Sequence, residues 1–150
     1  MARRLFVSLA IVLASLFAAP ARAQEPQTNP AGIWRMTYFH VKAGKMNDMM
    51  KDLREHAKAS MEFSKSKGRI KEYKILTNPT PQGPEDWSYA MAVHYANWAA
   101  LDPNEAFTKE QREFTEKHYG SAEKRDAAAA LRREMQTMLR SVLVNEVELK

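Results

Sequence analysis

Residues 33–45 read IWRMTYFHVKAGK, and this stretch decides the first half of the fold. Side chains alternate along Ile33–Val41: Trp34, Met36, Tyr38 and His40 share one face, and Arg35, Thr37, Phe39 and Val41 share the other. Aromatic and β-branched residues in a period of two predict a strand. The glycine-containing segment Lys42–Lys45 predicts the turn that leads into a helix.

The periodicity after this turn predicts a helix from about Met46 to Lys67, with an apolar, methionine-rich stripe at spacings of three and four. Gly68 is placed to end that helix in the left-handed conformation. A strand is then predicted over Arg69–Thr77. A loop with three prolines follows over Asn78–Glu85, and a strand with clean alternation follows over Trp87–Ala96.

Asp102-Pro103-Asn104-Glu105 predicts the start of the next helix, with Asp102 as the cap and an end near His118. Ser121 can cap a last helix over residues 122–140, and Ser141–Leu149 predicts a closing strand. The order β-α-β-β-α(α)-β predicts an α+β class: a ferredoxin-like domain with a four-stranded antiparallel sheet and helices on one face. The opposite face would carry large apolar groups, so we expect the sheet to pair with a second copy as a dimeric α/β barrel.

The N-terminus predicts export. Residues 1–23 join a basic start, an apolar run and an Ala-x-Ala end, which is the pattern of a cleaved signal peptide. Residues 24–32 predict a flexible segment, and residues 33–150 a single domain. The expected location is therefore periplasmic or secreted, with no membrane span in the mature chain.

Charge and cysteine content exclude several classes of site. Without the three arginines of residues 1–23, the chain keeps 20 basic and 18 acidic residues, and these are interspersed, which argues against a nucleic-acid partner. There are no cysteines, so disulfides, thiolate metal sites and a cysteine nucleophile are excluded. No metal site is predicted.

Two motifs resemble the dimeric α/β-barrel superfamily, near the antibiotic-biosynthesis-type monooxygenases, the stress-responsive barrel proteins and the NIPSNAP-like proteins. They are Tyr38–Lys45, which leads from a strand into a helix, and Tyr89–Asp102, which leads out of the third strand through a short helical turn. The resemblance covers roughly residues 33–149 and implies the paired barrel fold.

The resemblance also bears on cofactors. Haem-degrading members of the superfamily use an asparagine on the first strand, with a tryptophan and a histidine on the second crossover. In this chain Tyr38 or His40 stands on that strand, and Trp98 and His118 lie 20 residues apart, so haem is disfavoured. No cofactor is predicted.

The candidate catalytic residues are His40 and His94, because imidazole titrates near neutral pH. Both lie near the C-terminal ends of inner strands, where we expect them to be neighbours that could bind one ligand or relay a proton. The candidate ligand-binding residues are the aromatic side chains Trp34, Tyr38, Trp87, Tyr89 and Tyr95, which fit either an apolar pocket or a dimer core. His56 and His118 are interpreted as residues of the surface or of a helix end.

Three functions stay open from the sequence. The first is an exported homodimer that binds a small apolar or aromatic molecule. The second is an enzyme of the same fold, a cofactor-independent monooxygenase or isomerase with His40 or His94 as its base. The third is an assembly protein whose sheet face serves only for association.

Overall fold

The computed structural model describes residues 30–147. The elements run in the following order: β1 (Pro30–Val41), α1 (Met46–Asp52), the π-helical turn η1 (Leu53–Ala57), α2 (Lys58–Ser66), β2 (Glu72–Thr77), β3 (Tyr89–Tyr95), the 3-10 helix η2 (Trp98–Leu101), α3 (Glu105–Tyr119), α4 (Ala122–Met135) and β4 (Gln136–Val147). The predicted signal peptide lies outside the described residues. None of the helices within 30–147 has the length and apolar character needed to cross a bilayer.

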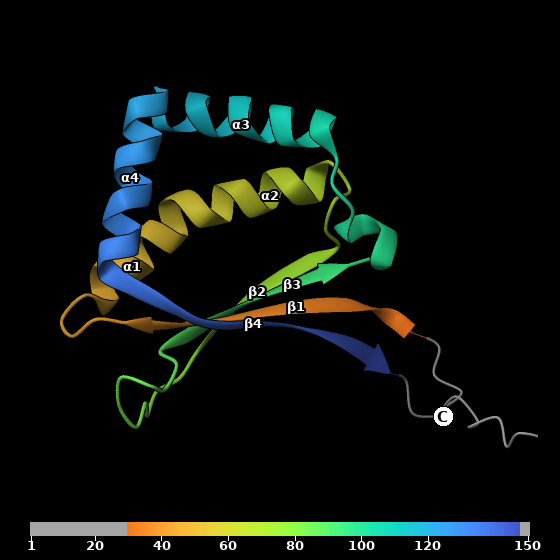
Figure 1. Ribbon diagram of the computed structural model, residues 1–150. Helices are drawn as coiled ribbons and strands as arrows, with labels where there is room; N and C mark the ends of the chain where they lie inside the picture. Colours follow the sequence, from red (N-terminus) through yellow and green to blue (C-terminus); the bar gives the residue numbers. More distant parts are fainter. Residues whose placement is uncertain (1–29, 148–150) are drawn as a thin grey trace, which may run out of the picture.

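The four strands form one antiparallel sheet in the order β2-β3-β1-β4. This order places the first strand between the third and the last, which is the split βαβ arrangement. The predicted ferredoxin-like α+β fold is therefore confirmed. All helices lie on one side of the sheet, and the other side is left open (Figure 1).

The alternation of β1 is confirmed by its neighbours. Phe39 and Val41 face the helices, where Val41 packs with Met49, Leu53 and Tyr89 in a buried core. The opposite set of alternating side chains faces the open side of the sheet: Trp34, Met36, Tyr38 and His40. There Ala90 and Ala92 of β3 are almost fully covered by the larger side chains on either side.

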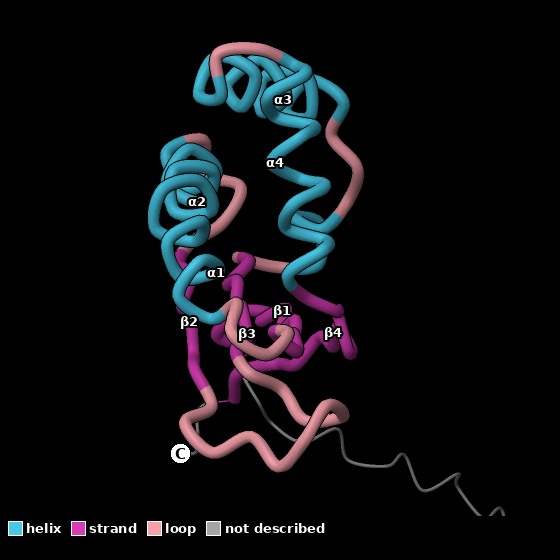
Figure 2. The backbone as a smooth tube through the Cα atoms, turned by 90° about the vertical axis from the view of Figure 1, so that its left-hand side faces the viewer, coloured by secondary structure: helices cyan, strands magenta, loops and turns pink. Residues whose placement is uncertain are grey.

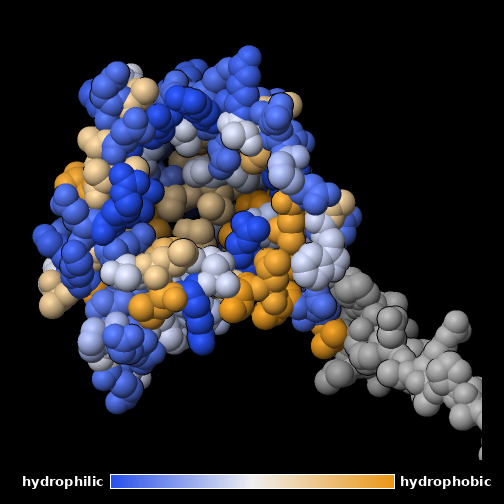
Figure 3. All heavy atoms as spheres, in the orientation of Figure 1, coloured by the Kyte–Doolittle hydropathy of each residue, from blue (hydrophilic) through white to orange (hydrophobic). Residues whose placement is uncertain are grey.

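Helix α4 does not lie flat on the sheet. It runs from the outer layer, where α3 lies alongside α2, down to the start of β4 (Figures 1 and 2). The space-filling view shows a hollow between these helices and the sheet (Figure 3). The apolar side of α4 therefore faces a hollow rather than a closed core.

Several predicted boundaries are corrected. Gln136–Arg140 belong to β4 and not to the last helix, because β1 pairs with β4 along its length, from Pro30 opposite Val147 to Val41 opposite Gln136. That pairing also takes Pro30–Gly32 out of the predicted flexible segment, whose residues 24–29 lie outside the described residues. The second strand begins at Glu72 and the third at Tyr89, both later than predicted.

The start of α3 is corrected as well. Its cap is Asn104, whose side-chain oxygen accepts a hydrogen bond from Phe107 N at 2.8 Å. Asp102 instead ends the 3-10 helix η2. The predicted glycine end at Gly68 (φ 69°) and the predicted cap at Ser121, which accepts from Lys124 N, are confirmed.

Candidate functional site

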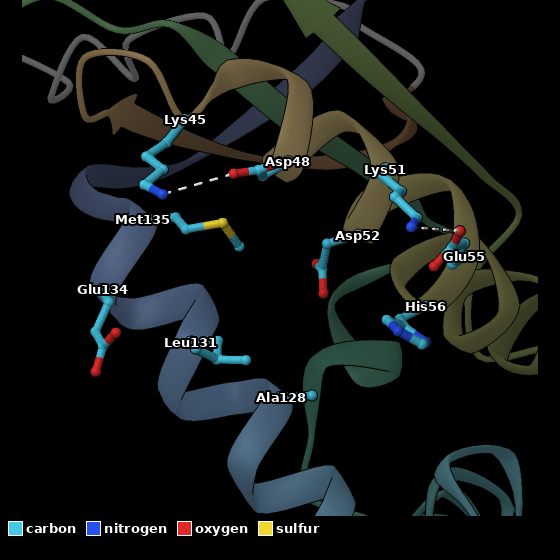
Figure 4. A pocket seen from close by; sticks show the side chains of 10 residues that line it. All are labelled: Lys45, Asp48, Lys51, Asp52, Glu55, His56, Ala128, Leu131, Glu134 and Met135. Atoms are coloured by element: carbon cyan, nitrogen blue, oxygen red, sulfur yellow. Dashed lines mark ion pairs between the residues drawn. The ribbon is translucent and has the colours of Figure 1, made fainter.

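A cleft lies between α1–η1 and α4 and has a volume of about 390 Å³. We call it the α1–α4 cleft. Figure 4 shows its side chains, which come from these two walls. They are Lys45, Asp48, Lys51, Asp52, Glu55, His56, Ala128, Leu131, Glu134 and Met135.

The α4 wall of the cleft is apolar. Ala128, Leu131 and Met135 recur at three and four residues and so share one side of the helix. Leu131 and Met135 point toward the α1 wall across the opening (Figure 4). Leu131 is 59% exposed, although its side of the helix is the one expected to be buried. The stripe therefore lines the cleft instead of completing the core.

The α1 wall is charged. Lys45 and Asp48 are joined at 3.6 Å, and Lys51 and Glu55 at 4.0 Å. Both pairs are exposed, so each contributes only about 0–1 kcal/mol and separates easily. These four side chains can turn toward a ligand at little cost.

Asp52 is committed to an internal contact. Arg132 of α4 donates to its two carboxylate oxygens at 2.6 and 2.9 Å. The hydrogen bonds that Arg132 donates to Asp52 raise the pKa of Arg132 above the ordinary arginine value, so the guanidinium stays charged. This bidentate contact ties α4 to α1 where Asp52 lines the cleft.

A pair of histidines stands beside this contact. Nδ1 of His56, in the π-helical turn, lies 3.0 Å from Nε2 of His118 at the end of α3. The His56 ring also packs against Tyr119 at 4.5 Å, and the Tyr119 hydroxyl accepts from Arg132 at 3.1 Å. One imidazole must donate and the other accept in such a contact. This contact could not be predicted from the sequence, because 62 residues separate the two histidines and no local pattern links them.

The two predicted catalytic histidines do not share a site. Trp34 is opposite His94, and His40 lies six residues further along β1, roughly 20 Å away at about 3.3 Å per residue. Because β1 and β3 are antiparallel, their C-terminal ends lie at opposite ends of the sheet. The expectation that they could act together on one ligand is therefore wrong.

Each of these histidines has its own local partners. The His40 ring contacts the Asp86 carbonyl oxygen at 3.1 Å. His94 stacks on Trp34 with ring centres 4.6 Å apart, and its side chain is 12% exposed. Neither lines the α1–α4 cleft.

The five predicted ligand-binding aromatic residues are also separated. Trp34 and Tyr38 lie on the open face, where the Trp87 ring meets Tyr38 edge-on at 5.7 Å. Trp87 precedes β3 and so does not follow its alternation. Tyr89 is 1% exposed in the core, where its hydroxyl donates to Gln136. Tyr95 lines a pocket of about 190 Å³, and Tyr38 and Trp87 together line another of about 360 Å³. Neither pocket shares a lining residue with the α1–α4 cleft.

No family model and no curated protein matches this chain. Among solved structures the chain is similar to a dimeric protein of unknown function and ferredoxin-like fold from Bacteroides fragilis. The sequence identity is 13%, over 79% of this chain and 97% of that chain, with a TM-score of 0.42. The fold is established here by the strand order, and neither a ligand nor an assembly is transferred from that protein.

The lining of the cleft fits the binding of a small molecule. Within residues 30–147 no group of three or more acidic or histidine side chains could hold a metal ion. The cleft instead combines an apolar wall with a rim of loosely paired charges, which is the usual composition of a small-molecule site.

Proposed function

We propose that this protein is an exported, homodimeric protein that binds a small amphiphilic molecule in the α1–α4 cleft. The observation that carries the proposal is the apolar stripe of α4, which faces an opening of ligand size. Pockets that enclose drug-sized ligands have volumes of about 300–1,000 Å³, and this cleft has about 390 Å³.

The lining indicates the chemistry of the ligand. Leu131 and Met135 offer an apolar surface, and the flexible thioether of methionine adapts to differing shapes. The lining has four acidic side chains and two lysines. Asp48 and Glu55 pair loosely with these lysines, Asp52 pairs with Arg132, and Glu134 has no ion pair among the described residues. We therefore expect an apolar body with a cationic or hydroxyl-bearing head.

Binding is tested by calorimetry of the mature protein with octylamine and with the neutral octanol. Leu131→Trp fills the opening and is expected to weaken octylamine binding at least about tenfold, which corresponds to about 1.4 kcal/mol. Leu143→Trp is the matched control, because Leu143 has similar access to solvent on β4, outside the cleft lining. Equal affinity in both variants would refute the assignment of the cleft.

The pairing with a second copy rests on the open face of the sheet. Val142 and Val144 of β4 are 39% and 43% exposed, and Leu76 of β2 is 40% exposed. Between them run Trp34 and Met36, which share that face through their pairing with Val144 and Val142. Apolar side chains gather along β4 at the surface (Figure 3). A continuous apolar face of this kind is typical of an interface.

The charges on this face fit a copy of the same surface. Lys74 and Glu72 flank it on β2, and Arg140 and Glu146 flank it on β4. Because each edge carries both signs, two copies related by a two-fold axis can bring opposite charges together. A partner of a single charge sign would meet repulsion at one residue of each edge.

Sedimentation velocity tests the pairing. Val144→Lys places a charge in the face and is expected to shift a dimer to a monomer at micromolar concentration. Leu143→Lys is the matched control, since the neighbouring side chain has nearly equal exposure, 42%, but points to the helix side. A wild-type monomer, or the same shift in both variants, would overturn the proposed pairing.

Export rests on the pattern of residues 1–23. Mass spectrometry of the protein recovered from the producing cells is expected to show a chain that starts at Gln24. A chain that keeps Met1 would contradict this part of the proposal and leave the cleft and the pairing untouched.

A further inference from the structure

A second pocket lies on the helix side of the sheet at the opposite end from His40. It is bounded by β1, β3, the end of α2, η2 and the start of α3, and has a volume of about 190 Å³. This pocket shares no lining residue with the α1–α4 cleft. It therefore raises a separate question of what it holds.

Two arginines are the only charged side chains in its lining. Arg35 comes from the helix-facing side of β1, and Arg69 from the segment between α2 and β2. The ion pairs among residues 30–147 include no acidic partner for either of them. Two guanidinium groups that share one pocket without a carboxylate create a local positive potential that attracts an anion.

Both guanidinium groups are held by aromatic rings. The centre of the Arg35 guanidinium lies 5.3 Å from the middle of the Tyr95 ring, and that of Arg69 lies 5.2 Å from the Phe107 ring. Arg69 also donates to the Asp102 carbonyl at 3.0 Å. Stacking of this kind fixes the planar fork of an arginine while leaving its other N–H groups available.

The rest of the lining is apolar or neutral. Ile70 and Val93 are each 6% exposed, and Met61 and Leu101 add further apolar surface. Gln111 and Ser64 supply neutral hydrogen-bonding groups at the α2–α3 side, 3.5 Å from one another. An ion without an apolar part would leave this apolar surface in contact with water.

We propose that this pocket binds a small carboxylic acid with an apolar body, whose carboxylate is held between Arg35 and Arg69. The arginine fork matches the two oxygens of a carboxylate. The body lies against Ile70 and Val93. The volume restricts the ligand to one smaller than those expected in the α1–α4 cleft. This site is independent of the proposed function of the cleft.

Calorimetry of the mature protein with benzoate tests the proposal, with benzyl alcohol as the neutral analogue and inorganic phosphate as the bare anion. Benzoate is expected to bind and benzyl alcohol is not. Arg35→Gln and Arg69→Gln are each expected to weaken benzoate binding at least about tenfold, because each removes a charge-assisted hydrogen bond. Arg133→Gln is the control, as Arg133 is an exposed arginine of α4 outside this pocket.

The outcomes separate the sources of binding. Weaker benzoate binding in Arg35→Gln and Arg69→Gln, together with unchanged binding in Arg133→Gln, supports the site. Arg35→Lys keeps the positive charge and checks that the weaker binding of Arg35→Gln is not caused by misfolding. Phosphate binding without benzoate binding would overturn the carboxylic-acid assignment. Equal binding of benzoate and benzyl alcohol, or no binding at millimolar concentration, would overturn the site. A benzoate affinity that falls in Leu131→Trp would also overturn it, since that change belongs to the cleft.

Discussion

Gly32 is the position where one added methyl group is expected to do the most damage to the sheet. Its backbone has φ 145°, which L-residues rarely adopt. A Cβ built there would lie 1.9 Å from Nε2 of His94 and 2.8 Å from the Tyr95 carbonyl oxygen. The Gly32→Ala variant therefore meets both backbone strain and a steric clash.

The magnitude follows from these two effects. Backbone strain at such a position costs about 1–3 kcal/mol, and forcing an extra group into a packed site costs about 1–3 kcal/mol. We expect Gly32→Ala to lower the free energy of unfolding by about 2–6 kcal/mol. Gly44→Ala is the control, because Gly44 has φ 75° but no atom within 4 Å of the added Cβ, so only the strain applies. Its expected cost is about 1–2 kcal/mol.

Urea denaturation at one fixed protein concentration measures both variants, with an unchanged slope required for the comparison. Adding His94→Ala to each tests the cause, since removal of the ring relieves the closest clash. A cycle of Gly32→Ala and His94→Ala should give a favourable coupling of at least about 1 kcal/mol. A Gly32→Ala variant as stable as Gly44→Ala, or a coupling of zero, would refute the reasoning.

Three further predictions concern polar contacts. The backbone N–H groups of Gln82 and Trp87 donate to the Asp86 carboxylate and lower its pKa in the folded protein. The stability that Asp86 gives to the loop 78–88 is therefore complete above its pKa in the unfolded chain, and it is lost as the pH falls through its pKa in the folded protein. A carboxyl NMR titration should give it a midpoint below the ordinary value of about 3.9, and a higher midpoint contradicts this. Tyr89→Phe removes the hydroxyl that donates to Gln136 and should lower the free energy of unfolding in urea by about 1–2 kcal/mol. An unchanged free energy of unfolding would show that the hydroxyl contributes nothing. Arg132→Leu leaves the mostly buried Asp52 carboxylate without its partner and should lower the free energy of unfolding, measured by thermal unfolding, by about 2–3 kcal/mol. Adding Asp52→Leu should recover part of that loss. If the effects of the two changes are fully additive, the contact does not contribute to stability.

The fold could be predicted because its decisive signals are local. The alternation along β1 and the glycine at position 68 each specify conformation within a few residues, and the strand order then follows from the number and sequence of elements. The boundary at Met135 could not be predicted in this way. Met138 and Leu139 fit a helical stripe as well as a strand, and the long partner β1 decides between them.

The candidate site was less predictable because it depends on contacts between distant residues. His56 and His118 meet only because η1 and the end of α3 lie together in space. The separation of His40 from His94, by contrast, follows from the antiparallel order that the sequence had already indicated. The apolar stripe of α4 was visible from its spacing, but the stripe itself says nothing of whether it meets a core or an opening.

The π-helical turn Leu53–Ala57 sets the rotational phase between the two halves of one long helix. A π turn holds an additional residue within an otherwise α-helical run, and each residue of an α-helix advances the direction of the side chains by about 100°. If the turn became regular α-helix with every residue retained, one half would rotate by about that angle relative to the other. Met49 could then stay in the core only if Phe63 left its ring contact with Phe114. Loss of one residue at the turn, such as Arg54, would instead restore a regular helix with the two halves nearly in phase, so a one-residue deletion should be tolerated better here than elsewhere between Met46 and Ser66.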